Sequence, residues 1–266
     1  MDYDIRSSGR AIKTIERLTG VPRDVWERER KRNQYRYDYT NVDEEIRQLV
    51  EKYRGTIPVL EDIELIVTHI TTSKSDCYSI LKEGLVDLRK AYNNEKSDLR
   101  MFLDENEIYI SVEERELRHK NNVYDISYGA CPRNYDSEEY ACWSVGRKLY
   151  YDFTVCGFLS INPKNIYGGY IHLRPEILSD IDKLLKTNLS DKWKRTHRTY
   201  EIVFRIPVKD TVYNGWDDDD YGQVMCYLSD AYICACTRPS TIELLCKNHV
   251  EILPEQIIEY GEFEEW

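Results

Sequence analysis

"LIVTHITTSKSDCYSILKEGLVDL", residues 65–88, joins an apolar, β-branched run to an amphipathic segment that ends near a glycine. The nearly continuous apolar run predicts a strand that is covered on both faces. In the second half, Cys77 and Ile80 fall on one face of a predicted helix, and Gly84 suits the left-handed position that ends many helices. His69 therefore stands close to the end of a buried strand.

Thr71 adds a second polar group at this strand end. Because side chains alternate across a strand, its hydroxyl is expected on the same face as the imidazole of His69. A lone histidine on an apolar strand is most often a core residue that bonds the backbone. The pair of side chains at a strand end is more typical of a ligand site.

The composition is that of a soluble globular chain. Its 266 residues can form one large domain or a domain with an appendage. The opening MDYDIRSS lacks a signal-peptide pattern and no apolar run is long enough to span a bilayer, so we expect a cytoplasmic protein without a membrane partner. Eight cysteines without paired CxxC spacing favour reduced thiols over zinc. We expect no metal cofactor.

The net charge of −11 is concentrated near the C-terminus. Residues 210–266 hold thirteen acidic side chains against two basic ones, which disfavours a broad phosphate-binding surface there. By contrast, "RERKRNQYRYDY", residues 28–39, interleaves Arg and Lys with Tyr. This pattern is found in nucleic-acid or protein contacts and also at solvated helix ends, and both interpretations stay open.

The first part of the chain predicts helices. Ser7 or Ser8 can cap the first, Gly20 can end it, Pro22 can open a second, and a third ends at Gly55. We therefore expect a helical appendage over residues 1–56 and a main domain over residues 57–266.

The main domain alternates short strands and helices. "EIYIS" and "TYEIVFRIPV" predict strands, and "MCYLSDAYICACT" predicts one or two more. Ser111 and Glu114 have capping-box spacing for a helix, Ser137 can cap another, and Pro175 can open a further one. The final segment predicts a strand, a turn at Lys247–Asn248, a short extended piece and a terminal helical turn. This order favours the α+β class.

Three of these segments together resemble the ADP-ribosyltransferase fold, in its His-Tyr-Glu branch. The residues that carry the resemblance are His69-Ile70-Thr71 with the following "SILKEGL", then Tyr109 in "EIYIS", then Glu243 in "STIELLCKNHVEILPEQI". The resemblance covers residues 61–112 and 237–258. It implies a split mixed sheet with an N-terminal helical appendage, and it leaves residues of about 112–198 as a central insertion.

The resemblance also implies an activity. NAD would be the co-substrate, His69 and Thr71 would bind the adenosine ribose, Tyr109 would pack against nicotinamide, and Glu243 would hold the nicotinamide ribose and orient the acceptor. A carboxylate there suits the oxocarbenium-like state through which the bond between nicotinamide and ribose breaks. Thr241 stands where arginine-modifying members carry Gln or Glu, which puts protein arginine in doubt as the acceptor.

The implied protein is an NAD-dependent ADP-ribosyltransferase, a glycosyltransferase acting on a macromolecule, either nucleic acid or protein. By analogy with the family, its setting would be a bacterial or phage toxin, effector or phage defence component. One alternative is an inactive nucleotide-binding or partner-binding module of the same fold. Another is a helical interaction protein that acts through residues 28–39, with an antitoxin or partner protein at the N-terminal helices.

Overall fold

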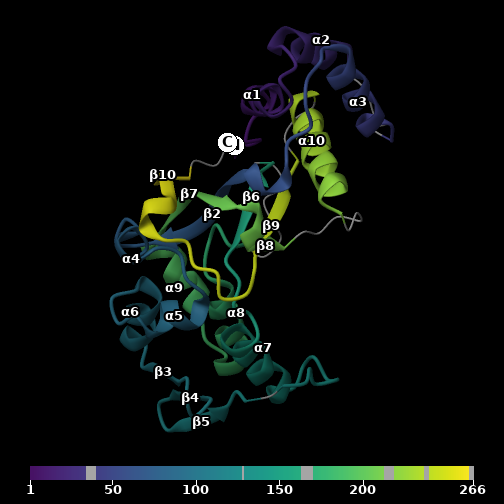
Figure 1. The fold of residues 1–266 in the computed structure, drawn as a ribbon. Coiled ribbons are helices and arrows are strands. Elements are labelled where there is room, and N and C mark those ends of the chain that lie inside the picture. The colour runs from purple at the N-terminus through teal and green to yellow at the C-terminus, as the bar shows by residue number, and fades with distance from the viewer. Residues whose placement is uncertain (34–39, 128, 163–169, 213–218, 237–239, 264–266) are drawn as a thin grey trace.

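The structure is a computed structural model that describes residues 1–33, 40–127, 129–162, 170–212, 219–236 and 240–263. It is a mixed α+β fold, as expected, built on one large and one small antiparallel sheet (Figure 1). In spatial order, the large sheet contains β10 (Ile257–Glu262), β7 (Arg198–Pro207), β2 (Glu64–Ser73), β6 (Cys156–Ser160), β9 (Ile242–Cys246) and β8 (Thr211–Val212). The short β1 (Asp2–Tyr3) pairs with β2 in parallel.

The small sheet and the helices complete the fold. The small sheet consists of β3 (Ile108–Ser111), β4 (Glu116–His119) and β5 (Asn122–Asp125). The helices of the described residues are α1 (Ser8–Thr19), α2 (Arg23–Asn33), α3 (Val42–Lys52), α4 (Tyr78–Glu83), α5 (Leu88–Asn93), α6 (Asp98–Glu105), α7 (Glu138–Tyr150), α8 (Glu176–Leu185), α9 (Leu189–Thr196) and α10 (Asp220–Cys236). None of these helices has the length and apolarity needed to cross a membrane.

Strand β2 forms where the β-branched run predicts it. All ten of its residues pair with β7, from Glu64 opposite Pro207 to Ser73 opposite Arg198. Its side chains are buried or half-buried on both faces, so the prediction of a covered strand is confirmed.

The N-terminal helices are packed into the main core. Ser7 caps α1 by accepting a hydrogen bond from the Arg10 amide, and Gly20 ends it at a φ of 69°, as predicted. The helices α1, α2 and α3 then pack with α10 at one end of the large sheet (Figure 1). Buried side chains such as Ile12 and Ile46 share one hydrophobic core with those of the sheet. The described residues of the segment 1–56 therefore share the core of the sheet.

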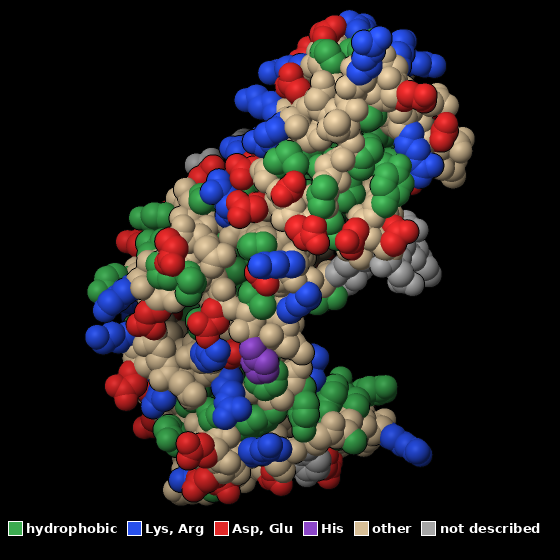
Figure 2. All heavy atoms as spheres, viewed as in Figure 1, with side chains coloured by type: hydrophobic (Ala, Val, Ile, Leu, Met, Phe, Trp, Pro, Cys, Tyr) green, Lys and Arg blue, Asp and Glu red, His purple; other side chains and the backbone are tan. Residues whose placement is uncertain are grey.

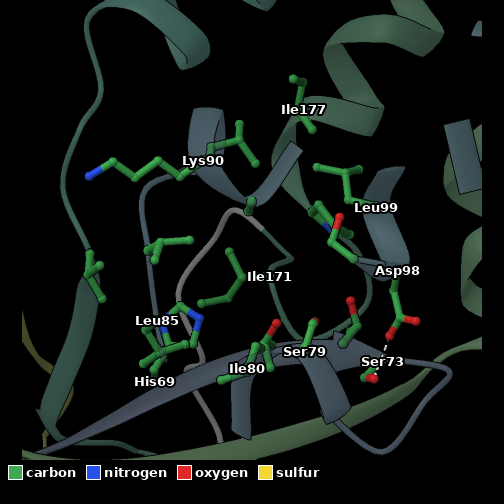
Figure 3. A pocket seen from close by; sticks show the side chains of 18 of the residues that line it. His69, Ser73, Ser79, Ile80, Leu85, Lys90, Asp98, Leu99, Ile171 and Ile177 are labelled. Carbon is green, nitrogen blue, oxygen red and sulfur yellow. Dashed lines mark hydrogen bonds between the residues drawn. The ribbon is translucent and has the colours of Figure 1, made fainter. Parts of the chain in front are cut away.

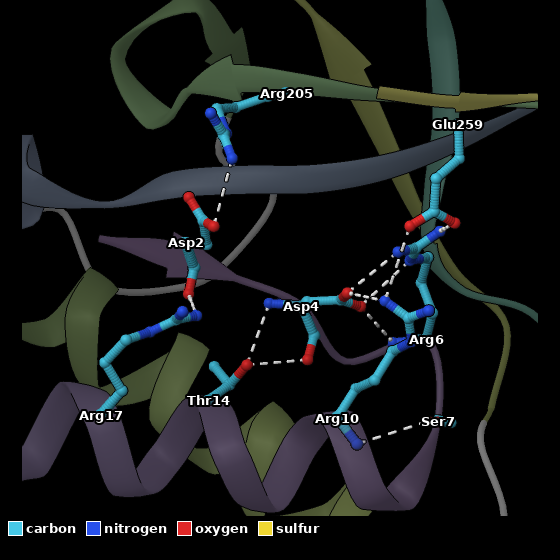
Figure 4. A network of polar contacts seen from close by, with 9 residues as sticks. All are labelled: Asp2, Asp4, Arg6, Ser7, Arg10, Thr14, Arg17, Arg205 and Glu259. Carbon is cyan, nitrogen blue, oxygen red and sulfur yellow. Dashed lines mark hydrogen bonds and ion pairs between the residues drawn. The ribbon is translucent and has the colours of Figure 1, made fainter. Parts of the chain in front are cut away.

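A network of charges joins the N-terminal segment to the sheet (Figure 4). The Asp4 carboxylate accepts hydrogen bonds from the guanidinium groups of Arg6 and Arg10, and Arg6 also pairs with Glu259 of β10. Only 15% of the Asp4 side chain is exposed. Burial acts to raise the pKa of Asp4, but the hydrogen bonds and charges of Arg6 and Arg10 together outweigh it and lower the pKa.

A second hydrophobic core lies at the other end of the molecule. It is formed by α5 to α9 and the small sheet, and its buried side chains include Leu103, Val145, Ile181 and Trp193. The expected central insertion falls largely within this core, together with α5 and α6, which precede it in the sequence. The β2 strand and the turn after it connect the two cores.

Three elements differ from the sequence-based expectation. Ser111 is the last residue of β3, and a turn follows it instead of a helix, because Leu117 is buried on a strand that pairs with β3. In the segment predicted as strands over residues 225–237, residues 225–236 belong to α10, which packs against α1 and α3, and residue 237 lies outside the described part. The predicted terminal helical turn forms as a 3-10 turn at Pro254–Gln256, but the chain then continues as strand β10, paired with β7, which the sequence does not predict.

Candidate functional site: a cavity beside strand β2

A cavity of about 400 Å³ lies where the end of β2 meets α4, α5, α6 and α8 (Figure 3). This volume is in the range of small-molecule sites. The walls are largely apolar and include Ile80, Leu85, Leu99, Ile171 and Ile177. About half of the lining residues nevertheless carry polar or charged side chains, among them Lys90, Lys148, Arg174, Asp152 and Glu176.

The turn between β2 and α4 forms one end of the cavity. Asp76 and Cys77 have positive φ angles of 53° and 60°, and α4 then runs to Gly84, whose φ is 90°. A side chain at Gly84 would overlap the carbonyl oxygen of Ile252, so a glycine is required there. Burial raises the pKa of the Cys77 thiol to about 12, which keeps it protonated and removes it as a nucleophile.

Asp98, the first residue of α6, holds this turn in place. Its Oδ2 accepts hydrogen bonds from the Ser73 hydroxyl at 2.5 Å, the Lys74 amide at 3.0 Å and the Ser75 hydroxyl at 3.1 Å. The Ser73 oxygen also accepts the Cys77 amide at 2.8 Å. Sequence reasoning missed Asp98, because nothing local to it indicates a partner twenty-five residues earlier.

His69 lines the cavity from β2. Its Nδ1 lies 2.7 Å from the carbonyl oxygen of Cys156 on β6. Because a carbonyl only accepts hydrogen bonds, Nδ1 carries the proton, and Nε2 of the neutral ring is an acceptor. Burial lowers the pKa of His69, although the bond to Cys156 acts in the opposite direction. The ring is therefore neutral near pH 7.

Thr71 lines the same cavity, two residues along β2. The pairing of β2 with β7 is continuous here, with His69 opposite Ile202 and Thr71 opposite Tyr200. The two side chains therefore share a face of the strand, as the alternation predicts. The Thr71 hydroxyl makes no hydrogen bond within the part of the chain that the structure describes. His69 and Thr71 thus offer an acceptor and a hydroxyl to a ligand in the cavity.

Tyr109 is not at this site. It lies on β3 of the small sheet, 46% exposed, and does not line the cavity. The guanidinium of Arg100 stands over its ring at 5.5 Å. Helices α4, α5 and α6 separate β3 from β2 in the chain, and β3 belongs to the other sheet, so a ligand held by His69 does not meet the Tyr109 ring.

Glu243 lies in the large sheet but on its other face. It is exposed on β9 opposite Phe158, and Phe158 is opposite Thr68 of β2. Residues opposite one another share a face and consecutive residues do not, so His69 and Glu243 point to opposite faces. They are also two strands apart, about 10 Å at the backbone. The structure does not assemble the three residues that the resemblance placed together.

Another polar group lines the cavity instead. Lys148 of α7 places its Nζ 2.5 Å from Oε2 of Glu176 on α8 and 3.4 Å from Oδ2 of Asp152. Burial acts to lower the pKa of Lys148, but the bond to Glu176 outweighs it and raises the pKa, so the ammonium stays charged. Sequence reasoning missed this pair, because its members belong to different helices.

The described part of the basic segment, residues 28–33, lies on α2, away from the cavity. Figure 2 shows Lys and Arg side chains gathered at the end of the molecule formed by α1 to α3. Of the basic segment, the structure describes residues 28–33, where Arg28 pairs with Asp24; residues 34–39 lie outside the described part. In the described ranges, no group of three or more His, Cys, Asp or Glu side chains could hold a metal ion.

Comparison with known proteins found no match: no family model fits the chain, and no curated protein or solved structure is significantly similar to it.

Proposed function

We propose that this protein binds a nucleotide of the NAD class in the cavity beside β2. The observation that carries the proposal is the position of His69 and Thr71, which come from the motif that resembles the ADP-ribosyltransferases and line one cavity of suitable size. The neutral imidazole can accept a hydrogen bond from a ribose hydroxyl, and the Thr71 hydroxyl can donate or accept beside it. The apolar walls suit a planar ring.

A calorimetric titration of the full chain with NAD and ADP-ribose tests the proposal. Loss of one hydrogen bond costs about 1.4 kcal/mol or a tenfold change in Kd, so His69→Gln and Thr71→Val should each weaken binding about tenfold. His119→Gln, on the small sheet, is the matched control and should bind as the unmodified chain does. Absence of binding at millimolar nucleotide by the folded protein would overturn the proposal.

A second candidate is ADP-ribosyl transfer to a macromolecule, with Glu243 as the carboxylate. The observation in its favour is that Glu243 is exposed on the same sheet as His69, in line with Thr68 and Phe158. Against it stands the opposite orientation of the two side chains. Transfer through both residues would require β9 to change its pairing, whereas nucleotide binding needs no rearrangement.

Nicotinamide release distinguishes these candidates. The protein is incubated with NAD in the presence of protein, RNA or DNA extracts, and free nicotinamide is measured by chromatography. Release that Glu243→Gln abolishes and Glu61→Gln leaves intact would establish transfer, and the stimulating extract would identify the acceptor class. Binding without release, in every extract, supports the binding module alone.

A further inference from the structure

The ion pair of Lys148 and Glu176 gives the cavity a specific polar wall. Only 13% of the Lys148 side chain is exposed, compared with 34% for Glu176. Both residues line the cavity, as does Asp152, the second partner of Lys148. The chemical group that this wall recognises can be inferred from its donors and acceptors, and the inference rests on the proposed nucleotide-binding function.

The pair has unused hydrogen-bonding capacity. An ammonium has three N–H donors. Two of the Lys148 donors bond to Glu176 Oε2 and Asp152 Oδ2, so one donor is unused. Glu176 Oε1 has no hydrogen-bond partner among the described residues. A half-buried ion pair is stabilised further when its remaining donors and acceptors are bonded. The wall therefore offers one donor and one acceptor side by side.

A primary carboxamide is the complement of this arrangement. Its oxygen accepts and its NH₂ group donates along one edge, so it can bond to Lys148 and to Glu176 together. A carboxylate in the same place would present only acceptors, and one of its oxygens would lie against the charge of Glu176. The wall should thus distinguish an amide from the corresponding acid.

The position of the pair relative to His69 fits a single ligand. Asp152, which bonds Lys148, and Cys156, which bonds His69, belong to one segment that lines the cavity. Four residues span at most about 14 Å of chain. One ligand of the NAD class can therefore contact His69 with a ribose and Lys148 with a group on its ring, while that ring packs against the apolar walls.

We propose that Lys148 and Glu176 recognise the carboxamide of a planar, nicotinamide-like ring in this cavity. The pair sets the preference for amide over acid, and His69 and Thr71 contribute affinity without that preference.

The test compares NAD with nicotinic acid adenine dinucleotide, which differs from it by a carboxylate in place of the carboxamide. Calorimetry on the full chain should show NAD binding at least tenfold tighter. Glu176→Gln replaces the repelling carboxylate by an amide that can donate, so the preference should fall below threefold. Glu139→Gln, on the exposed side of α7, should keep the tenfold preference, and thermal melting checks that each variant is folded.

The outcomes separate this inference from the proposed function. Equal binding of both dinucleotides by the unmodified chain, or an unchanged preference in Glu176→Gln, would overturn the inference; a weakening by His69→Gln in the same experiment would still support the nucleotide site. Binding of neither dinucleotide would overturn both. Glu176→Gln, which keeps the size of the side chain, is the variant that decides the inference.

Discussion

Removal of the Asp98 carboxylate should release the turn between β2 and α4. Oδ2 of Asp98 accepts three hydrogen bonds at 2.5 to 3.1 Å, from Ser73, Lys74 and Ser75. Hydrogen bonds to a charged group contribute about 1.5 to 3 kcal/mol each when buried. Because this turn is partly exposed, we take about 1 kcal/mol for each and expect Asp98→Ala to lower the free energy of unfolding by about 3 kcal/mol.

Urea denaturation followed by circular dichroism measures this change. Asp98→Asn retains an acceptor oxygen but loses the charge, and it should cost about 1 kcal/mol, less than the alanine variant. Asp104→Ala, on the same helix, removes only a surface ion pair with Arg100 and should change the free energy by less than about 0.5 kcal/mol. A loss below about 1 kcal/mol in Asp98→Ala, close to that control, would show that the carboxylate does not hold the turn.

Three further predictions concern the fold. The lowered pKa of Asp4 means that the folded state binds fewer protons than the unfolded state, so the stabilisation from Asp4 is present above the unfolded pKa of about 3.9 and is lost as the pH falls through the folded pKa. The free energy of unfolding should therefore depend less on pH in Asp4→Asn than in the unmodified chain. An unchanged pH dependence would contradict the network. Gly84→Ala should destabilise the protein by at least about 2 kcal/mol in urea, because the methyl group meets a carbonyl oxygen, whereas Gly9→Ala in α1, which has open space, should stabilise it by about 0.5 kcal/mol or more. Ile46→Ala should cost about 2 to 5 kcal/mol and lower the melting of the whole chain in one transition; separate melting of the N-terminal helices would count against a shared core.

Local sequence patterns predict some of the site residues but not how they are arranged. The sequence predicts His69 and Thr71 together because alternation along one strand is a property of neighbouring residues. It predicts Glu243 from its type and its place in the order of elements, but the orientation of Glu243 depends on the pairings of β2 with β6 and of β6 with β9. The position of Tyr109 depends in the same way on which sheet β3 joins.

Helix α10 departs from its predicted strands for a related reason. Tyrosine, cysteine and small apolar residues follow one another in it without a clear period of 3.6. In the structure, α1 and α3 pack against it, and the half-buried stripe that remains includes the apolar Cys226 and Ile233, which hide the helical period in the sequence. The terminal β10 escapes prediction because its partner, β7, lies some fifty residues earlier.

The sequence alone determined the features set by contacts between near neighbours. They include the Ser7 and Ser137 caps, the end of α1 at Gly20, and the strand that carries His69 and Thr71. Tertiary structure decided which side chains share the cavity, because those pairings join segments that lie far apart in the chain. The Lys148–Glu176 ion pair arises only when α7 packs against α8, and the turn held by Asp98 forms only when α6 lies against the end of β2. No periodicity along the chain predicts these contacts.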